Sequence, residues 1–550
     1  MLKLHEGLRS SSYVMNLDGE GSCCSSVDDY RLPEELEPML SDDCIIQVLH
    51  CLSKQDISAC SLVCKRWYEL SKSQSVWHQL FMEDFCTVSI HSRLSSSEMG
   101  GSPSAYGCYS VQAKAEDAQR LLGLERETTD WRTLYQRRAE VDRGWFKGDS
   151  SSQLLDGHTD YIRFAQLDGS TLITASGSMS YSDCSIRVWD MDTGTLRQLL
   201  RGHMGPVWCL SYDSASGKLA SGSDDYTVRY WDAQAGNCVS LQDPDSSVRC
   251  IHMDQQSGQM VAGTDFGKLM LWDTRELDRM LQAGIAHVRT ELERVHQPLV
   301  VPKGPAVSSR RVVVDGSHHV QMLNNAESRA VTAIQVQSGT CASTSSEQDS
   351  SICLWNISSD AEGRGCGGGW KLQHQLWDPG MQCVLTMSFE KPLNMIVGGC
   401  ADNMMRVWDL ERGELMMKLE GHTRQITAHQ FDAHLLASAS VSGHVRVWDL
   451  RSQQCVHVLK HDAGVNAFQF DNGRLASGTW DGRVLLWDLS SGKMIQQWQA
   501  HKNGVGVWAL SMDDYHIVSA GPDMRVCVRS FLPEDLRFSR WDAKDITQPY

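Results

Sequence analysis

The segment KLASGSDDYTVRYWD, residues 218–232, contains two strand-like stretches joined by a polar turn, and it ends in Trp231-Asp232. The segment RLASGTWDGRVLLWD, residues 474–488, has the same arrangement. Copies of the last stretch recur mostly about 40 residues apart, a period typical of folds that repeat four short strands. Their tryptophans are Trp189, Trp231, Trp272, Trp355, Trp408, Trp448 and Trp487. The pattern predicts an all-β array of repeated small sheets.

These apolar strands ending in Trp-Asp resemble the WD-repeat β-propeller, and the resemblance covers residues 148–531. A weaker final copy places Arg529 where the tryptophan would stand. We expect eight blades, or seven if one weak copy is not a blade. The long gap between Trp272 and Trp355 predicts an insertion at about residues 276–329. The segment 150–155 is the expected closing strand of the ring, which protects its open edges.

The resemblance also implies a buried hydrogen-bond chain of His, Ser or Thr, Asp and Trp within a blade. Three copies match this pattern, and in each the Asp lies six residues before the Trp. Because His, Ser and Asp recur in several repeats, we interpret them as structural networks and not as a hydrolase triad. The matching sets are His158, Thr174, Asp183, Trp189; His203, Ser221, Asp225, Trp231; and His461, Ser477, Asp481, Trp487.

A second module precedes the repeats. Residues 40–80 place apolar side chains at helical spacing, with Ser41 and two acidic residues as a helix start. The string with VCKRW at 63–67 resembles the F-box, a small all-α three-helix module that we assign to residues 39–85, although Ser41 stands where the family usually has Pro. The resemblance implies binding to a Skp-type adaptor and through it to a cullin. The residues expected to form that contact or its supporting core are Leu40, Ile45, Val48, Leu49, Leu52, Val63 and Trp67.

The remaining segments complete a multidomain layout. We predict a disordered tail at 1–38, a Ser/Gly-rich linker at 86–110 and a C-terminal tail at 532–550. Residues 111–147 predict a helical stalk that either fixes the distance between the two modules or only caps the propeller.

Client binding is expected at the loops around the central channel, since propellers present their loops on a rigid ring. Aromatic and Arg side chains near the start of the inner strands are typical binding anchors. Arg matches a phosphorylated client, whereas the tryptophans suit an unmodified peptide equally well. The expected contact residues are Arg163, Trp208, Arg249, Trp480 and Trp508.

The composition excludes other classes of function. The formal net charge of −17 disfavours nucleic acid and anionic membranes as primary partners. No stretch is long and apolar enough to span a bilayer, and the first residues lack the pattern of a signal peptide, so a cytoplasmic and/or nuclear location is expected. The 19 cysteines show no zinc spacing, and we expect no metal, no cofactor and no catalytic residue.

The most favoured function is therefore a non-enzymatic substrate receptor of a Skp–cullin–F-box (SCF) ubiquitin ligase. The strings WDTR at 272–275 and WDLR at 448–451 fit a short signature of receptors for a different cullin ligase, which is the first alternative. The second alternative is a WD-repeat scaffold without a ligase role.

Overall fold

In the computed structural model the chain forms two compact units, residues 1–82 and 83–550. The described residues are 42–50, 52, 54–60, 65–82, 85, 130–177, 183–242, 246–254, 257–283, 287–289, 299–300, 311–314, 321–324, 330–345, 351–357, 370–471, 473–502, 504–534 and 536–537. In this part of the chain, none of the helices has the length and apolar character required to cross a membrane.

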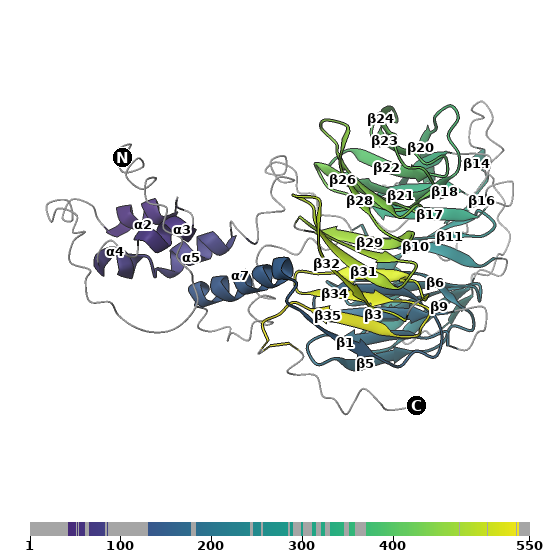
Figure 1. Cartoon of the computed structure of the whole chain (residues 1–550). Helices are drawn as coiled ribbons and strands as arrows, with labels where there is room; N and C mark the ends of the chain where they lie inside the picture. The colour runs from purple at the N-terminus through teal and green to yellow at the C-terminus, as the bar shows by residue number, and fades with distance from the viewer. Residues whose placement is uncertain are drawn as a thin grey trace. The chain divides into compact units, whose positions relative to one another are not determined.

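The first unit is all-α, as predicted (Figure 1). Its described helices are α2 (Asp42–His50), α3 (Lys54–Cys60), α4 (Lys65–Leu70) and α5 (Gln74–Phe81). Three helices were expected, but residues 71–73 separate α4 from α5. The core of this unit includes Ile45, Leu49, Ile57, Leu80 and Phe81. So small a core gives a module little stability of its own.

The second unit contains eight sheets arranged as a propeller, and the prediction of eight blades is confirmed (Figure 1). Each blade begins with an inner strand along the channel and continues outward through antiparallel neighbours. Blade 1 contains β2 (Ile162–Asp168), β3 (Thr171–Ser176), β4 (Ile186–Asp190) and β5 (Thr195–Leu200). Blade 2 contains β6 (Val207–Asp213), β7 (Lys218–Ser223), β8 (Thr227–Asp232) and β9 (Cys238–Gln242). Blade 3 starts with β10 (Val248–Asp254), β11 (Gln259–Thr264), β12 (Leu269–Asp273).

Blades 4 to 8 repeat the same arrangement. Blade 4 contains β17 (Val331–Gln337), β18 (Thr340–Ser345), β19 (Ile352–Ile357) and β20 (Trp370–Leu376). Blade 5 contains β21 (Val384–Glu390), β22 (Met395–Cys400), β23 (Met405–Asp409) and β24 (Leu415–Leu419). Blade 6 contains β25 (Ile426–Phe431), β26 (Leu435–Ser440), β27 (His444–Asp449) and β28 (Gln454–Lys460). Blade 7 contains β29 (Val465–Asp471), β30 (Arg474–Thr479), β31 (Arg483–Asp488) and β32 (Lys493–Gln499). Blade 8 contains β33 (Ala509–Met512), β34 (His516–Ala520) and β35 (Val526–Ser530).

The ring closes through blade 8. Strand β1 (Ser151–Leu155) pairs antiparallel with β35, with Ser151 opposite Ser530 and Leu155 opposite Val526. The expected closing strand therefore supplies the outer strand of the last blade. This pairing joins the two ends of the propeller and removes two open strand edges.

The segment predicted as an insertion, 276–329, contributes to two blades. Helix α8 (Thr274–Gln282) packs on β8, β9 and β12, and β13 (His287–Arg289) then pairs parallel with β9 of blade 2. The chain returns through β14 (Leu299–Val300), β15 (Arg311–Val314) and β16 (Gln321–Asn324), and β16 pairs with β12. The segment thus supplies the fourth strand of blade 3, and β15 and β16 begin within the strand-like stretch RRVVVDGSHHVQML, 310–323, from which the sequence predicts an outer strand that completes a blade.

Helix α7 (Trp131–Lys147) is docked on the propeller. Its Trp145 ring stacks on Phe531 with 3.6 Å between ring centroids, and Trp145 Nε1 donates to the carbonyl oxygen of Asp514 over 3.0 Å. Within the predicted stalk, 111–147, only the part from residue 130 onward is described. A stacked, hydrogen-bonded tryptophan attaches this helix firmly to blade 8.

Buried ion pairs reinforce the same junction. The guanidinium of Arg138 lies 3.1 Å from the Asp514 carboxylate, and that of Arg474 in blade 7 lies 3.5 Å from the same group. Both arginine side chains are almost fully buried. Removing one partner of such a network would leave an uncompensated buried charge, so the contact favours a single orientation of α7 on the ring.

Candidate functional site

Blades 1 and 2 each contain the complete network that the sequence predicts. In blade 2, His203 Nδ1 lies 2.9 Å from the Asp225 carboxylate and Nε2 lies 2.7 Å from Ser221 Oγ, while Trp231 Nε1 donates to the same hydroxyl over 2.8 Å. In blade 1, the bonds from His158 to Asp183 and Thr174, and from Trp189 to Thr174, are all 2.9 Å long. Burial raises the pKa of Asp183 and of Asp225, but the hydrogen bonds to each carboxylate, with that of the paired histidine first among them, together outweigh it, and each pKa lies well below its usual range.

Blade 7 differs from the prediction. His461 Nε2 lies 2.8 Å from Ser477 Oγ, and Trp487 Nε1 donates to that hydroxyl over 3.1 Å. The expected partner Asp481, however, accepts from Thr479 Oγ1 and pairs with Arg483 over 3.3 Å, so it does not reach His461. Instead, His461 Nδ1 lies 3.2 Å from the Gly443 carbonyl oxygen of blade 6. The guanidinium two residues later competes for the carboxylate, and the prediction for Asp481 is wrong.

Blade 8 contains a network that the sequence reasoning missed. His501 Nδ1 lies 2.9 Å from the Asp523 carboxylate and its Nε2 lies 3.1 Å from Ser519 Oγ. The predicted hydrogen-bond network includes the tryptophan at the end of the third strand, and blade 8 has Arg529 at that position. Arg529 stacks over Trp498 at 4.1 Å and donates to Ser150 Oγ over 2.7 Å. The spacing between His501 and Asp523, which equals that between His203 and Asp225, was the available signal.

These networks are built for stability and not for nucleophilic chemistry. The hydroxyl groups of Thr174, Ser221 and Ser477 are fully buried, and each is already bonded to both a histidine and a tryptophan. A serine nucleophile needs access to its substrate and a free oxyanion site beside it. Among the described residues, no group of three or more His, Cys, Asp or Glu side chains is arranged to hold a metal ion.

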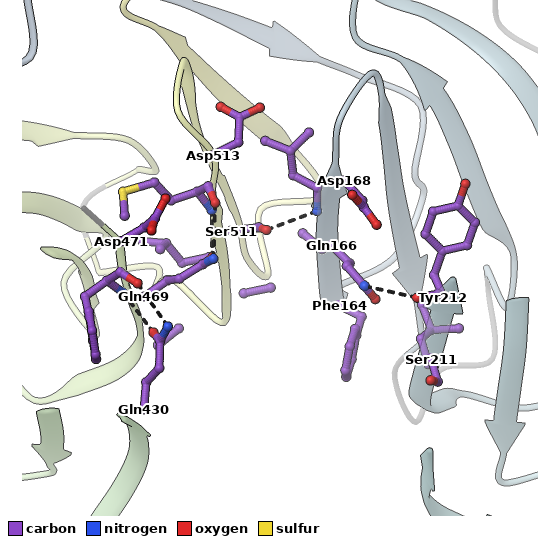
Figure 2. A pocket seen from close by; sticks show the side chains of 18 of the residues that line it. Phe164, Gln166, Asp168, Ser211, Tyr212, Gln430, Gln469, Asp471, Ser511 and Asp513 are labelled. Atoms are coloured by element: carbon purple, nitrogen blue, oxygen red, sulfur yellow. Dashed lines mark hydrogen bonds between the residues drawn. The ribbon is translucent and has the colours of Figure 1, made fainter. Parts of the chain in front are cut away.

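A belt of polar side chains joins all eight inner strands around a channel of about 630 Å³. Figure 2 shows five of its members, Gln166, Ser211, Gln430, Gln469 and Ser511. In Figure 2, Gln166 donates to the Tyr212 carbonyl of the next blade, and Ser511 accepts from the Leu167 amide across the closing joint. Gln430 and Gln469 each make a reciprocal pair of bonds to one backbone position of the following blade. The belt residues are those at the fifth inner-strand position of blades 1 to 7 and, in blade 8, the third residue of the shorter β33: Gln166, Ser211, His252, Gln335, Ser388, Gln430, Gln469 and Ser511.

Sequence reasoning did not identify this belt, although a polar residue at the fifth position of every inner strand was visible. The belt bonds the blades to one another, since each side chain pairs with the neighbouring inner strand. It therefore stabilises the wall of the channel, and it leaves the ends of the channel as the places where variable side chains can act.

The second position of the inner strands divides the channel mouth into two halves. In blades 4, 6 and 7, Thr332, Thr427 and Asn466 donate to the Val384, Val465 and Val507 carbonyls of the next blade over 3.1, 2.9 and 3.1 Å. Blade 5 has Leu385 at this position, and its side chain has no polar group to donate. We call blades 4 to 7 the bonded half. Blades 8, 1, 2 and 3 place large side chains at the same position, and we call them the ladder half.

The large side chains of the ladder half form one alternating stack. The guanidinium of Arg163 lies 5.0 Å from the Trp508 ring centroid and 4.3 Å from that of Trp208, and the guanidinium of Arg249 lies 4.4 Å from that of Trp208. We call Trp508, Arg163, Trp208 and Arg249 the ladder. Cation–aromatic contacts at these distances are attractive, and all four side chains are half-buried. Four of the five predicted client residues are therefore together.

The polar groups of the ladder are partly committed within the chain. Arg163 Nε donates to the Gly177 carbonyl oxygen over 2.8 Å, and Arg249 Nε lies 2.6 Å from the Asp265 carboxylate. The hydrogen bond to Asp265 raises the pKa of Arg249, whereas burial, with the neighbouring charge of Arg249, lowers the pKa of Arg163. The two arginines are therefore not equivalent, which the sequence did not reveal.

The fifth predicted client residue, Trp480, lies outside the ladder. It occupies the turn between β30 and β31 in blade 7 and is half-exposed. Strand pairing places this turn at the same end of the channel as the ladder, because the first and third strands of a blade run in the same direction. Trp480 thus shares the face with the ladder but belongs to the bonded half.

The structure sorts the predicted adaptor-contact residues in the first unit. Ile45 and Leu49 are buried and form its core, whereas Val48, Leu52 and Trp67 are half-exposed. Leu40 and Val63 lie outside the described residues. Tyr68, which was not predicted, is exposed, with the Lys72 ammonium 3.8 Å from its ring centroid.

Comparison with known proteins supports both modules. A family model described as F-box-like matches residues 42–83, and the WD domain, G-beta repeat, matches residues 149–190 and 194–232. A model of the N-terminal domain of nucleolar protein 10-like proteins matches residues 381–530. The two resemblances inferred from the sequence are confirmed by these matches.

Individual relatives match only part of the chain. The F-box/WD repeat-containing protein sel-10 of Caenorhabditis elegans is 35% identical over 79 residues, or 14% of each chain. An F-box protein of Saccharomyces cerevisiae is 23% identical over 192 residues, or 35% of this chain and 28% of that protein. Mitochondrial division protein 1 of Pyricularia oryzae is 34% identical over 86 residues, or 14% of this chain and 13% of that protein. The chain thus spans less than a third of the length of these relatives.

A solved structure resembles the fold. The computationally designed protein Ika8 has a TM-score of 0.52 and 24% sequence identity to this chain, and it covers 68% of this chain and 98% of its own. This likeness concerns the fold alone.

Proposed function

We propose, on the premise that the chain is an F-box/WD-repeat protein, that it is the substrate receptor of an SCF-type ubiquitin ligase. The F-box would bind a Skp-type adaptor and through it a cullin, and the propeller would hold a client protein for ubiquitination. The observation that carries the proposal is the combination of an F-box-like module with a rigid ring that bears a non-repeating ladder at its channel mouth.

The adaptor contact would use the half-exposed apolar side chains of the first unit. Val48, Leu52 and Trp67, with the exposed Tyr68, are not needed to fill the core that Ile45 and Leu49 already form. Trp and Tyr are enriched among the residues that dominate binding at protein interfaces, and burying the neighbouring apolar side chains against a partner is also favourable. Burying them would also stabilise a module whose own core is small.

The client contact would lie on the ladder half of the channel mouth. Because α7 is fixed to the ring by Trp145 and Arg138, a client held at the ladder has a defined position relative to that helix. Such a fixed attachment raises the effective concentration of client lysines at a ubiquitin donor. The chain would contribute proximity and orientation, and its partners would supply the chemistry. We propose a cytoplasmic and/or nuclear location for this work.

The adaptor claim is tested with two matched substitutions on α2. Val48→Asp places a charge at a half-buried apolar position, whereas Gln47→Asp places the same charge at an exposed polar position of the same helix. We expect calorimetry with a purified Skp-type adaptor to show at least about tenfold weaker binding for Val48→Asp, an interface hot-spot effect, and no change for Gln47→Asp. Circular dichroism reports whether the helices remain. Equal binding by both variants would refute the adaptor contact.

A receptor for a different cullin ligase is the second candidate. Arg275 and Arg451 are both exposed, and each backbone amide donates to the Asp two residues earlier over 2.9 Å, although Arg275 lies in the first turn of helix α8 and Arg451 in a turn before β28. If cullin capture survives Val48→Asp but is lost when both arginines become Ala, this candidate replaces the first. If no variant captures a cullin, the protein is a scaffold.

A further inference from the structure

An apolar rim surrounds the ladder. At the ladder end of the channel, five large side chains of blades 8, 1, 2 and 3 are exposed, and we call them the apolar rim: Tyr161, Met204, Tyr226, Phe266 and Met524. Met204 is 84% exposed, Phe266 52% and Tyr226 47%. Tyr161 also contacts the ladder directly, since its ring meets the edge of Trp508 with 5.7 Å between centroids. An exposed apolar patch of this kind marks an interaction surface.

Two rim residues adopt a backbone conformation that their side chains disfavour. The turn between the second and third strands of a blade contains one left-handed residue, which is Gly267, Gly443 or Gly482 in blades 3, 6 and 7 and Asn403 in blade 5. In blades 2 and 8 this position holds Tyr226 and Met524, both with φ of 65°. Bulky residues in this region are strained, and such strain concentrates at functional sites. Since neither side chain is buried, burial within the chain does not offset the strain.

The charges at the mouth do not favour a phosphate. The two guanidinium groups of the ladder face three carboxylates: Asp265 pairs with Arg249, Asp224 also raises the pKa of Arg249, and Asp160 acts in the same direction on Arg163. A phosphorylated residue carries close to two negative charges and requires an excess of cations. Two positive groups among three negative ones do not provide that excess.

From the rim, its strained turns and this charge balance, we infer that the ladder half binds an unphosphorylated, apolar client segment that is neutral or basic. The inference rests on the proposed function and deepens it, because it names the chemistry of the client. The rim side chains contact the apolar residues of the segment, and the ladder forms a rigid aromatic floor between them. A basic residue in the segment would be attracted to Asp224 and Asp265, which are half-buried, whereas Asp160 is buried.

The test uses the full chain immobilised with its F-box intact and a random 12-residue peptide library displayed on phage. We expect recovered peptides to be rich in apolar residues and poor in Asp and Glu. Synthetic copies should bind at least about tenfold more weakly to Tyr226→Gly and to Met524→Gly, as for interface hot spots. Since glycine relieves the strain at these two positions, the thermal midpoint should hold or rise while binding falls, which a merely structural role cannot produce.

Asn403→Gly is the matched control, because it makes the same change at the same turn position in the bonded half. It should leave peptide binding unchanged. A second arm compares each recovered peptide with a copy that carries a central phosphoserine, and the phosphorylated copy should bind more weakly. Tighter binding of the phosphorylated copy, or recovery of no peptide, would overturn the inference. If the chain still captured the adaptor after one of these two outcomes, the inference about the client would fail while the proposed ligase role would stand.

Discussion

The two halves of the channel mouth use the same backbone for different purposes. In the bonded half, Thr332, Thr427 and Asn466 direct their polar groups to the neighbouring blade. In the ladder half, the equivalent positions carry two arginines and two tryptophans that stack on one another. The described His–Asp pairs between strands lie in blades 1, 2 and 8, all within the ladder half. The half proposed to bind the client is thus also the half with the most internally locked blades, and pre-organisation of this kind favours tight binding.

The largest expected loss of stability comes from Asp225→Ala, and Asp481→Ala at the equivalent position of blade 7 is its comparison. Asp225→Ala in blade 2 removes bonds of 2.9 Å to His203, 2.9 Å to the Met204 amide and 2.6 Å to Thr227, and we expect it to lower the free energy of unfolding by about 3 kcal/mol. Asp481→Ala in blade 7 removes a partly exposed pair with Arg483 and the bond from Thr479 Oγ1, but no bond to a buried histidine, and should cost about 1 kcal/mol or less. Urea denaturation measures both, and equal losses would contradict the assignment of Asp481.

Acid should loosen blades 6 and 7 of the bonded half before blades 1 and 2 of the ladder half. Burial lowers the pKa of His422 and of His461 to about 4, and neither has a carboxylate partner among the described residues. The unfolded chain binds protons on these residues below its ordinary histidine pKa of about 6.5, whereas the folded chain does not, so stability is lost as the pH falls from about 6.5 to 4. In blade 2, burial also lowers the pKa of His203, but Asp225 opposes the shift.

Hydrogen–deuterium exchange at pH 7 and pH 5 tests this ordering. The amides of β26 and β30 should lose protection at pH 5 before those of β3 and β7. His422→Gln, which cannot titrate, should reduce the loss in blade 6. Uniform loss around the ring, or earlier loss in blades 1 and 2, would count against the proposed difference between the halves.

The belt gives the next effect. Gln430→Leu removes both bonds to the Phe470 backbone, of 2.9 and 2.8 Å, and leaves that amide and carbonyl unpaired, so we expect a loss of about 2 kcal/mol. Gln166→Leu removes a single bond of 3.5 Å and should cost clearly less. Thermal unfolding of the two variants provides the comparison. Indistinguishable midpoints would mean that the belt is not a structural joint.

The smallest expected effect comes from the bonded half of the mouth. Thr427→Val keeps the shape of the side chain and removes its 2.9 Å bond to the Val465 carbonyl, which should cost about 1 kcal/mol. Peptide binding at the ladder half should not change. A substantial loss of binding would show that the two halves are coupled and do not act as separate surfaces.

The sequence predicted the fold well because the Trp-Asp strands are repeated, and repetition makes each weak copy recognisable from its neighbours. It could not predict contacts that depend on competition between side chains. Asp481 was assigned to His461 by spacing, but the guanidinium of Arg483 takes the carboxylate. The ladder residues were found by position, whereas their stacking and the pairing of Arg249 with Asp265 arise only once the side chains of different strands and blades come together.

Other features were harder to predict because a sequence motif was incomplete, or because residues with different roles share one sequence pattern. Blade 8 lacked its tryptophan, so His501, Ser519 and Asp523 were overlooked. The segment 276–329 was predicted as an insertion because its short strands, β15 and β16, lack the Trp-Asp signal, although the stretch 310–323 already indicated an outer strand that completes a blade. In the F-box, the helical pattern identified Ile45 and Val48 together, and only burial separates the core residue from the half-exposed one.

The most direct test of the receptor claim is a double dissociation in one capture experiment. Wild-type chain, Val48→Asp and Tyr226→Gly are used to capture proteins from a eukaryotic lysate, and the Skp-type adaptor, cullin and remaining proteins are quantified. We expect Val48→Asp to lose adaptor and cullin but to keep the proteins held by the propeller, and Tyr226→Gly to keep adaptor and cullin but to lose those proteins. Loss of both sets by either variant, or of neither set by both, would contradict a receptor with two separate binding surfaces.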